Sequence, residues 1–469
     1  MIASCSAGVT ARSLKASPPP YGRESVEPSP AVVPIAVSAA EPAAAAEPAA
    51  AATPEPAAPA PTVNVALFAV AGAVTVANIY FPQPLLAAVA HGLEVSERTA
   101  GLIASAAQIG YALGILLLVP LADTARLRRL TSVLLALTTG SLLVAAAAPD
   151  MVTLTLATLA LSTTTVLPQI LTPVAAVLAG PGRRGRVVGL VGLGLTLGST
   201  LSRTVSGAVT DASGSWRAAY VVAAVATAGL LWVLPRRLPE RMDTTSSKRR
   251  ASYLRLLAGL PRLLADHREL RISALLGACV FAAFSVFWAV LAFHLAAPPL
   301  GYGPGAAGLF GVLTLPAALA SAAAGPLADR YGPGAVNAGG LAAAGLGLGV
   351  AGLAPYSPVA LVAGANLLVV GVSSCQVASQ ARIFAIGRTV AARVNTVFML
   401  ATFGGGALGS LAGTWLYTVY GWSAALLAAG TFVAVAGLVV AVVVRPAVPS
   451  CGPDPTREAG GVRPRTSQE

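Results

Sequence analysis

Arg203 is the residue whose type and position point most directly to chemistry. It lies well inside the apolar stretch 187–210, and a charged side chain at that depth in hydrocarbon costs roughly 2.5–3.5 kcal/mol on insertion scales. No Asp or Glu occurs inside this or any other long apolar stretch, so the sequence offers no buried acidic partner. Two hypotheses follow. Either the guanidinium contacts an anionic or polar substrate group or counters a proton pathway, or it extends outward to reach Asp211 or helix-end carbonyls.

Amide and aromatic side chains in the other apolar stretches could line a solute-binding cavity together with this arginine. Buried amides need hydrogen-bond partners, and each one alone is more often an interhelical bond than a ligand contact. The candidate cavity residues are Asn78, Tyr80, Gln83, Gln108, Gln169, Arg203, Trp288 and Gln376. His91 and His294 lie near the outer ends of their stretches, and interfacial packing is their simplest interpretation.

Motifs of enzymatic and nucleotide chemistry are missing from the sequence. There is no H-E-x-x-H, no G-x-S-x-G, no G-x-x-x-x-G-K-[ST] loop and no close carboxylate pair in an apolar stretch. The four cysteines have no C-x-x-C spacing, so neither a disulfide framework nor a metal site is indicated. We therefore expect no enzyme, no ATP-driven pump, no metal and no cofactor, and keep a membrane-embedded enzyme as a remote alternative.

The elements that must position these residues are membrane-spanning helices. The 469 residues are 56% hydrophobic and only 10% charged, with a mean hydropathy of +0.76, whereas a soluble protein carries about 25% charged residues. One crossing takes about 20 apolar residues, so an all-α membrane protein is predicted. The twelve predicted spans are 64–90, 98–120, 128–148, 151–173, 187–210, 216–234, 272–296, 304–325, 334–354, 358–380, 391–418 and 422–444.

Composition divides the chain into five parts. Residues 1–62 are rich in Ala and Pro and predict a disordered cytoplasmic tail rather than a signal peptide, because no unbroken apolar stretch follows the first basic residues. The remaining predicted parts are an N-terminal six-helix bundle (63–234), a basic cytoplasmic linker (235–271), a C-terminal six-helix bundle (272–445) and a second disordered cytoplasmic tail (446–469).

Basic residues mark alternate loops of this arrangement. One set of loops holds 20 Lys and Arg, and the opposite set holds only Arg98 and Arg217. Cytoplasmic loops collect Lys and Arg, so we expect a multi-pass protein of the cell (inner or plasma) membrane with both termini cytoplasmic. These loop residues explain the net charge of +12. We therefore expect the lipid bilayer as a partner and no nucleic acid.

The two halves repeat the same landmarks. Pro-Leu-Ala-Asp ends at Asp123 and again at Asp329, 206 residues later, and Trp216 and Trp422 open equivalent spans at the same spacing. Such spacing predicts two six-helix halves related as parallel repeats, with a site at their interface near the middle of the membrane.

At these landmarks the sequence resembles the major facilitator superfamily, and the resemblance covers about residues 64–445. The family motif Gly-x-x-x-Asp-(Arg/Lys)-x-Gly follows the eighth span as Gly325-Pro-Leu-Ala-Asp329-Arg330-Tyr331-Gly332. The first copy, after the second span, keeps Asp123 and the basic cluster but lacks both glycines. The segment from Asn78 to Gln83 also resembles bacterial exporter-like members of the drug and sugar efflux type.

This resemblance implies a conformational latch on the cytoplasmic side that favours the outward-open state. A carboxylate there can accept hydrogen bonds from a helix N-terminus and pair with a guanidinium; the other interpretation is that these are solvated loop charges. The implied latch residues are Asp123, Arg126, Arg128, Arg129, Asp329 and Arg330.

Glycines at four-residue spacing predict close helix packing in the fifth and eleventh spans, rather than ligand contact. These helix-packing glycines are Gly194, Gly198, Gly405, Gly409 and Gly413. In the family, the fifth span of antiporters often carries a Gly-Pro pair, which is missing here.

The leading functional hypothesis is a secondary active transporter of a small organic solute that works by alternating access. Export is favoured. If the protein is an antiporter, the family resemblance implies protons as the coupling ion. Uptake or uniport of a sugar or organic anion is the alternative. We expect the protein to act as a monomer.

Overall fold

The computed structural model describes residues 65–123, 125–179, 183–238, 253–387 and 390–443, and all of them belong to one compact unit. Within these ranges every regular element is a helix, as lipid requires, because only helices and closed barrels satisfy their own backbone groups there. The tails predicted for 1–62 and 446–469 lie outside the described residues.

The N-terminal half is built from helices that proline breaks in two places. Pro82 and Pro84 interrupt the first span after Tyr80, and Pro168 follows the break in the fourth span; proline removes a backbone donor and ends helices. The elements are α1 (Val65–Tyr80), η1 (Gln83–Leu85), α2 (Leu86–Gly92), α3 (Glu97–Ala100), α4 (Leu102–Leu117), η2 (Val119–Asp123), α5 (Leu127–Ala146), α6 (Met151–Thr164), α7 (Leu167–Leu178), α8 (Arg184–Ser213) and α9 (Trp216–Arg237).

The C-terminal half has longer continuous helices. Its elements are α11 (Arg268–Ala296), α12 (Pro304–Leu313), α13 (Leu315–Ala320), η3 (Ser321–Ala323), α14 (Ala324–Leu353), α15 (Pro358–Phe384), α16 (Ala391–Tyr420) and α17 (Trp422–Val443). Between the halves, α10 (Tyr253–Asp266) forms inside the stretch predicted as a linker. It packs on α11 and α16 and buries Leu263.

Eleven helical runs in the described chain are long and apolar enough to cross a membrane. One of them, Pro304–Leu353, has 50 residues and would measure about 75 Å as a straight helix, more than twice the hydrocarbon thickness. The chain turns inside it at Gly332, where φ is 82° and ψ is 154°, just before Pro333. This run therefore holds two crossings, and the total agrees with the twelve predicted spans.

The repeat seen in the sequence is also present in the helix boundaries. α9 and α17 begin at Trp216 and Trp422 and end at Arg237 and Val443, 206 residues apart at both ends. α8 and α16 are offset by 207 residues at both ends.

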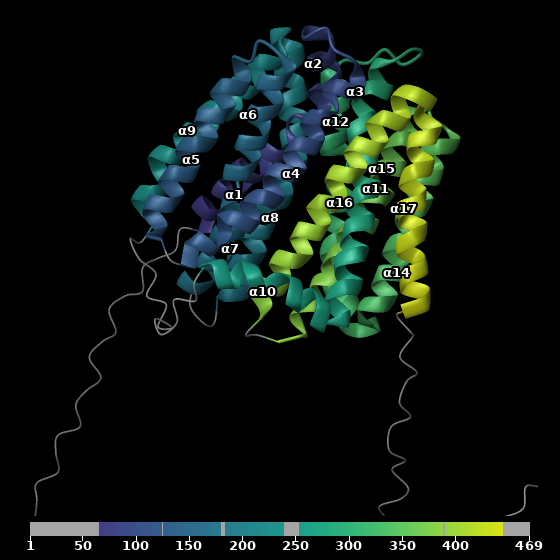
Figure 1. Cartoon of the computed structure of the whole chain (residues 1–469). Coiled ribbons are helices and arrows are strands. Elements are labelled where there is room, and N and C mark those ends of the chain that lie inside the picture. The colour runs from purple at the N-terminus through teal and green to yellow at the C-terminus, as the bar shows by residue number, and fades with distance from the viewer. Residues whose placement is uncertain (1–64, 124, 180–182, 239–252, 388–389, 444–469) are drawn as a thin grey trace, which may run out of the picture. The chain divides into compact units, whose positions relative to one another are not determined.

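Neighbouring helices pack in pairs within each half. α1 packs on α8, α4 on α6, and α5 on α9 in the N-terminal half, while α11 packs on α16 and α17, and α14 on α15, in the C-terminal half. Figure 1 shows the first group in purple to teal and the second in green to yellow. Large apolar side chains such as Val152, Trp232 and Leu353 are exposed, as expected for surfaces that face lipid.

Candidate solute-binding site

Arg203 lies in the second half of α8, and it is only 4% exposed. Its Nε donates to Oε1 of Gln83 at 2.7 Å, and its Nη1 donates to the carbonyl of Ser199 at 2.8 Å. The guanidinium also lies over two rings, 4.9 Å from the centroid of Tyr80 and 4.2 Å from that of Trp288. Four of the residues predicted for the cavity, from three separate spans, thus form one group.

The proline break in the first span explains how this group forms. Gln83 begins the short η1, so its side chain leaves the line of α1 and reaches α8. The Ser206 hydroxyl donates to the carbonyl of Phe81 at 2.8 Å and fixes the same break against α8. Trp288 comes from α11, so the arginine of one half is covered by an aromatic ring of the other.

Asp211 is not the partner of Arg203. Its Oδ2 accepts a hydrogen bond from the backbone N–H of Gly305 at 3.0 Å, while Arg203 is engaged by Gln83 and Ser199. The guanidinium of Arg203 is therefore buried and bonded to Gln83 and Ser199, and it does not extend toward Asp211.

A row of aromatic rings continues from Trp288 across the interface between the halves. Each ring lies within about 6 Å of the next: Trp288 to Phe284 at 6.0 Å, Phe284 to Phe281 at 5.4 Å, Phe281 to Phe403 at 5.1 Å, and Phe403 to Tyr111 at 4.6 Å between centroids. Tyr111 belongs to α4 of the N-terminal half, and its hydroxyl is hydrogen-bonded by Nε2 of Gln169 at 3.3 Å. We call this row, from Trp288 to Tyr111, the aromatic row.

The remaining predicted cavity residues have other surroundings. Asn78 is 2% exposed and donates to the hydroxyls of Thr227 at 3.2 Å and Thr165 at 3.5 Å, so it joins helices within its own half. Gln108 is buried and lines a void of about 10 Å³ together with Gln83, and its Oε1 has no partner among the described residues. Gln376 is half-buried on α15, and no hydrogen bond joins it to the Arg203 group in the described chain.

The halves are joined directly near one end of the helices. Oγ1 of Thr204 in α8 donates to the carbonyl of Gly308 at 2.8 Å and accepts from the N–H of Val312 at 3.1 Å, so it bridges to α12. A Cβ at Gly207 would collide with the carbonyl of Pro304, so the two backbones touch. We call this end of the molecule, where α8 ends and α12 begins, the closed end.

The repeat supplies a second contact of the same kind at the closed end. The Ser105 hydroxyl at the start of α4 donates to the carbonyl of Ala407 in α16 at 3.3 Å, and a Cβ at Gly101 would collide with Thr414. These hydrogen bonds between the halves in the described residues join α12 to the second half of α8, and the first turn of α4 to the second half of α16.

The predicted packing glycines lie against neighbouring backbone. Cβ atoms at Gly194 and Gly198 would collide with the carbonyls of Ala69 and Ala73 in α1. In the other half, Gly405 and Gly409 lie in the same way on the carbonyls of Ala278 and Ala282 in α11, and Gly413 lies on Val286. These glycines thus allow close packing of α1 on α8 and of α11 on α16.

The residues proposed for the latch lie at the opposite end, which we call the basic end. Arg126, Arg128, Arg129, Asp329 and Arg330 are all exposed there. The guanidinium of Arg330 lies over its neighbour Tyr331 at 5.1 Å, and the side chain of Asp123 lies outside the described residues. The ion pairs found in the described chain join Glu269 to Arg268 and to Arg382, both at 3.5 Å.

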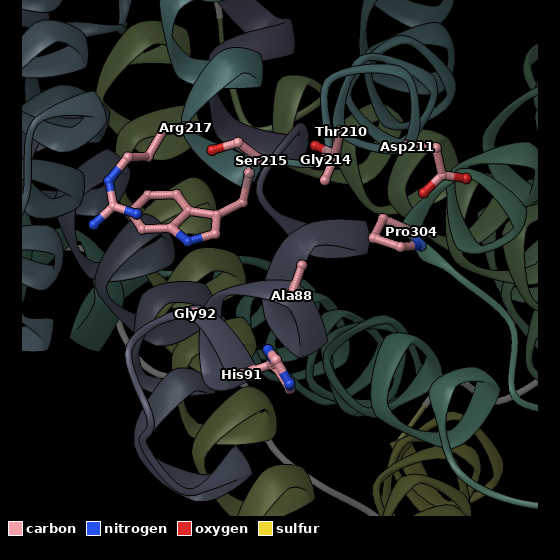
Figure 2. Close-up of a pocket in the computed structure, with 10 residues that line it drawn as sticks. Ala88, His91, Gly92, Thr210, Asp211, Gly214, Ser215, Arg217 and Pro304 are labelled. Carbon is pink, nitrogen blue, oxygen red and sulfur yellow. The ribbon is translucent and has the colours of Figure 1, made fainter.

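A cavity of about 400 Å³ opens at the closed end (Figure 2). Its lining comes from α2, α8, α9 and the first residue of α12 and includes His91, Asp211 and Arg217. No sequence pattern indicates this cavity, because its lining residues are distant from one another in the chain. His294, by contrast, is buried, stacks on Trp422 at 4.0 Å and bonds the carbonyl of Pro355, which is a packing role.

Two repeated halves of membrane-spanning helices, in contact at one end around buried polar and aromatic residues, define a membrane transporter. The chain matches the family model of the Major Facilitator Superfamily over residues 66–314 and 273–467. It belongs to this family, as the loop motifs and the repeat predicted.

Relatives agree with this assignment. The chain is 36% identical over 367 residues to "Uncharacterized transporter YgaY" of Escherichia coli O157:H7, covering 78% of this chain and 92% of that protein. It is 34% identical over 384 residues to "Probable transporter SCO4007" of Streptomyces coelicolor, covering 81% and 87%. Both names describe transporters, which places the chain in a transporter family rather than in an enzyme family.

Solved structures show the same fold at low identity. The nucleoside transporter NupG superposes with a TM-score of 0.65 and 16% identity, covering 80% of this chain and 98% of that one. The inward open conformation of the xylose transporter XylE from E. coli gives 0.60 and 15%, covering 82% and 97%.

Proposed function

We propose that the protein is a secondary active exporter that moves a small organic solute by alternating access of its two halves. The observation that carries this proposal is the distribution of contacts between the halves. They join at the closed end through Thr204, Asp211 and Ser105, whereas the described side chains of the latch set are exposed at the basic end. A solute would then reach the Arg203 group from the basic end.

The direction of transport rests on the orientation in the membrane. Loops rich in Lys and Arg favour the cytoplasmic side, so the basic end would be cytoplasmic, and the described state would face inward. Solute entry from the cytoplasm is then the first step of export. The latch around Asp123 and Asp329 would form in the opposite, outward-facing state.

Proton coupling is compatible with this scheme but needs groups at the helix ends. In the described spans acidic side chains occur only near helix ends and turns, and Asp211 and Glu97 at the closed end are examples. Uptake or uniport of a sugar or organic anion is the alternative, which the cationic Arg203 supports through its affinity for anions.

The test is accumulation of radiolabelled solutes in cells with and without the protein. Export predicts lower accumulation when the protein is present, and an uncoupler that collapses the proton gradient should abolish the difference. Higher accumulation with the protein would instead establish the uptake alternative. The Gly207→Ala variant is the matched control. It should prevent the two halves from closing at the closed end without contacting Arg203, so we expect it to be expressed but not to transport.

A further inference from the structure

The guanidinium of Arg203 has hydrogen-bond donors to spare. An arginine carries five N–H groups in a planar fork. Nε and one N–H of Nη1 are used by Gln83 and Ser199, and Nη2 has no acceptor among the described residues. No nitrogen of Arg203 is among the fully buried unpartnered atoms, which do include Nη1 of Arg382, so Nη2 keeps some exposed surface.

Within the described part of the chain, no acidic side chain forms an ion pair with Arg203. Its hydrogen-bond acceptors are an amide oxygen and a backbone carbonyl, and its two ring contacts are neutral. The nearest acid on its own helix is Asp211, two turns further on and already bonded to Gly305. A buried cation without an anion is costly, and a ligand carboxylate would bring the missing charge and accept two parallel N–H bonds.

Two aromatic rings lie beside the guanidinium, with Cζ 4.9 Å from the centroid of Tyr80 and 4.2 Å from that of Trp288. The edge that carries Nη2 has no acceptor among the described residues, and we call it the free edge of Arg203. The aromatic row continues from Trp288 toward Tyr111, and its rings are buried in this state, so the body of a ligand would lie against them only when the rings separate. Flat aromatic bodies pack well on such rings.

We propose that the transported solute is an organic carboxylate with an aromatic body, its carboxylate on the free edge of Arg203 and its body along the aromatic row. This inference rests on the proposed function, because it places the solute in the same region between the halves. The same charge disfavours cationic solutes. The fixed cation, rather than the ring surface, sets the charge preference of the site.

A binding measurement on the purified full-length protein in lipid nanodiscs tests this proposal separately from transport. The probes are benzoate, neutral benzamide of nearly the same shape, and cationic benzylamine, each titrated by calorimetry. We expect benzoate to bind at least about tenfold more tightly than benzamide, since charge-assisted bonds are about twice as strong as neutral ones. Benzylamine should bind most weakly.

Variants assign this preference to the arginine. Arg203→Gln should abolish the difference between benzoate and benzamide, and Arg203→Lys should keep part of it because the charge remains. Arg236→Gln, which changes an exposed arginine at the basic end that is not a latch residue, should leave it unchanged. Each variant must melt cooperatively and elute as the parent does, and the lysine variant covers the case in which the glutamine variant does not fold.

The outcomes separate the two proposals. Equal binding of benzoate and benzamide by the parent protein, or a preference that survives in Arg203→Gln, would overturn the carboxylate assignment. Arg203-dependent benzoate binding without any lowering of cellular accumulation would leave the site intact and refute export. Export of solutes without regard to their charge would support the exporter and refute the carboxylate class.

Discussion

The carboxylate of Asp211, near the end of α8, caps the first turn of α12 in the other half of the molecule. Its Oδ2 lies 3.0 Å from the backbone nitrogen of Gly305. The N-cap residue of α12 is Gly303, which has no side chain to supply a cap. Anionic groups are stabilised at helix N-termini by the helix dipole and the free N–H groups, so this one bond ties the two halves at the closed end.

Removing this cap should shift the protein toward opening at the closed end. Loss of an N-cap costs about 1 kcal/mol, which corresponds to about a fivefold change in the ratio of open to closed states. Asp211→Ala should therefore lengthen the distance between spin labels at positions 152 and 359, which lie at the exposed outer ends of α6 and α15. Asp211→Asn, which keeps an acceptor without the charge, should lie between alanine and the parent. Identical distance distributions in all three proteins would contradict the capping role.

Gly207 should be essential for closure because its backbone touches α12. A methyl group at this position would collide with the carbonyl of Pro304, and a collision with backbone cannot be relieved by a rotamer change. Gly207→Ala should reduce transport at least about tenfold, with normal insertion in the membrane. Gly192→Ala on the same helix has open space around it and serves as the control. Equal transport by both variants would count against the closed end as a moving contact.

Two adjacent glycines in α16 allow a matched test of helix packing. A methyl at Gly405 would collide with the carbonyl of Ala278 in α11, whereas a methyl at Gly404 would meet nothing within 4 Å. Gly405→Ala should destabilise the protein by about 1–3 kcal/mol through overpacking, seen as a lower melting temperature. Gly404→Ala should melt with the parent or slightly above it, since alanine favours helices. A reversed order would refute the assigned contact.

The latch proposed at the basic end predicts a conformational shift in the opposite direction to the one expected for Asp211→Ala. If Asp123 holds the outward-facing state together, Asp123→Asn should favour the inward-facing state and slow transport. Spin labels at the basic end should then report a larger share of the separated state. A variant that transports at the parental rate would leave Asp123 as a solvated loop charge.

Much of the fold could be predicted from the sequence because membrane spans have a strong local signal. Apolar length and the Lys and Arg loops predicted the twelve spans, and the 206-residue repeat predicted equal helix boundaries such as those at Trp216 and Trp422. The family prediction is confirmed. The helix α10 was missed because its apolar residues are too few for a span, and only its periodicity could have indicated it.

The site was predicted less completely, because its contacts join distant residues. Nothing local in the sequence pairs Arg203 with Gln83, 120 positions away; the signal was only that a buried cation needs partners. Asn78 and Gln376 carry equally polar side chains, yet the first bonds threonines of its own half and the second does not reach the arginine. The neighbours that an amide side chain meets depend on the rotation of its helix about the helix axis. Hydropathy does not indicate this rotation.

The two halves differ at the position of Arg203, and this difference affects how a bound solute would be oriented. α16 repeats α8 with an offset of 207 residues, so the counterpart of Arg203 is Ser410, a buried residue in tight helix packing. The N-terminal half thus has a charged side chain where the C-terminal half has a small neutral one. A solute bound between the two halves would therefore meet two chemically different surfaces. Its polar group would face the N-terminal half, which carries Arg203, in every transport cycle.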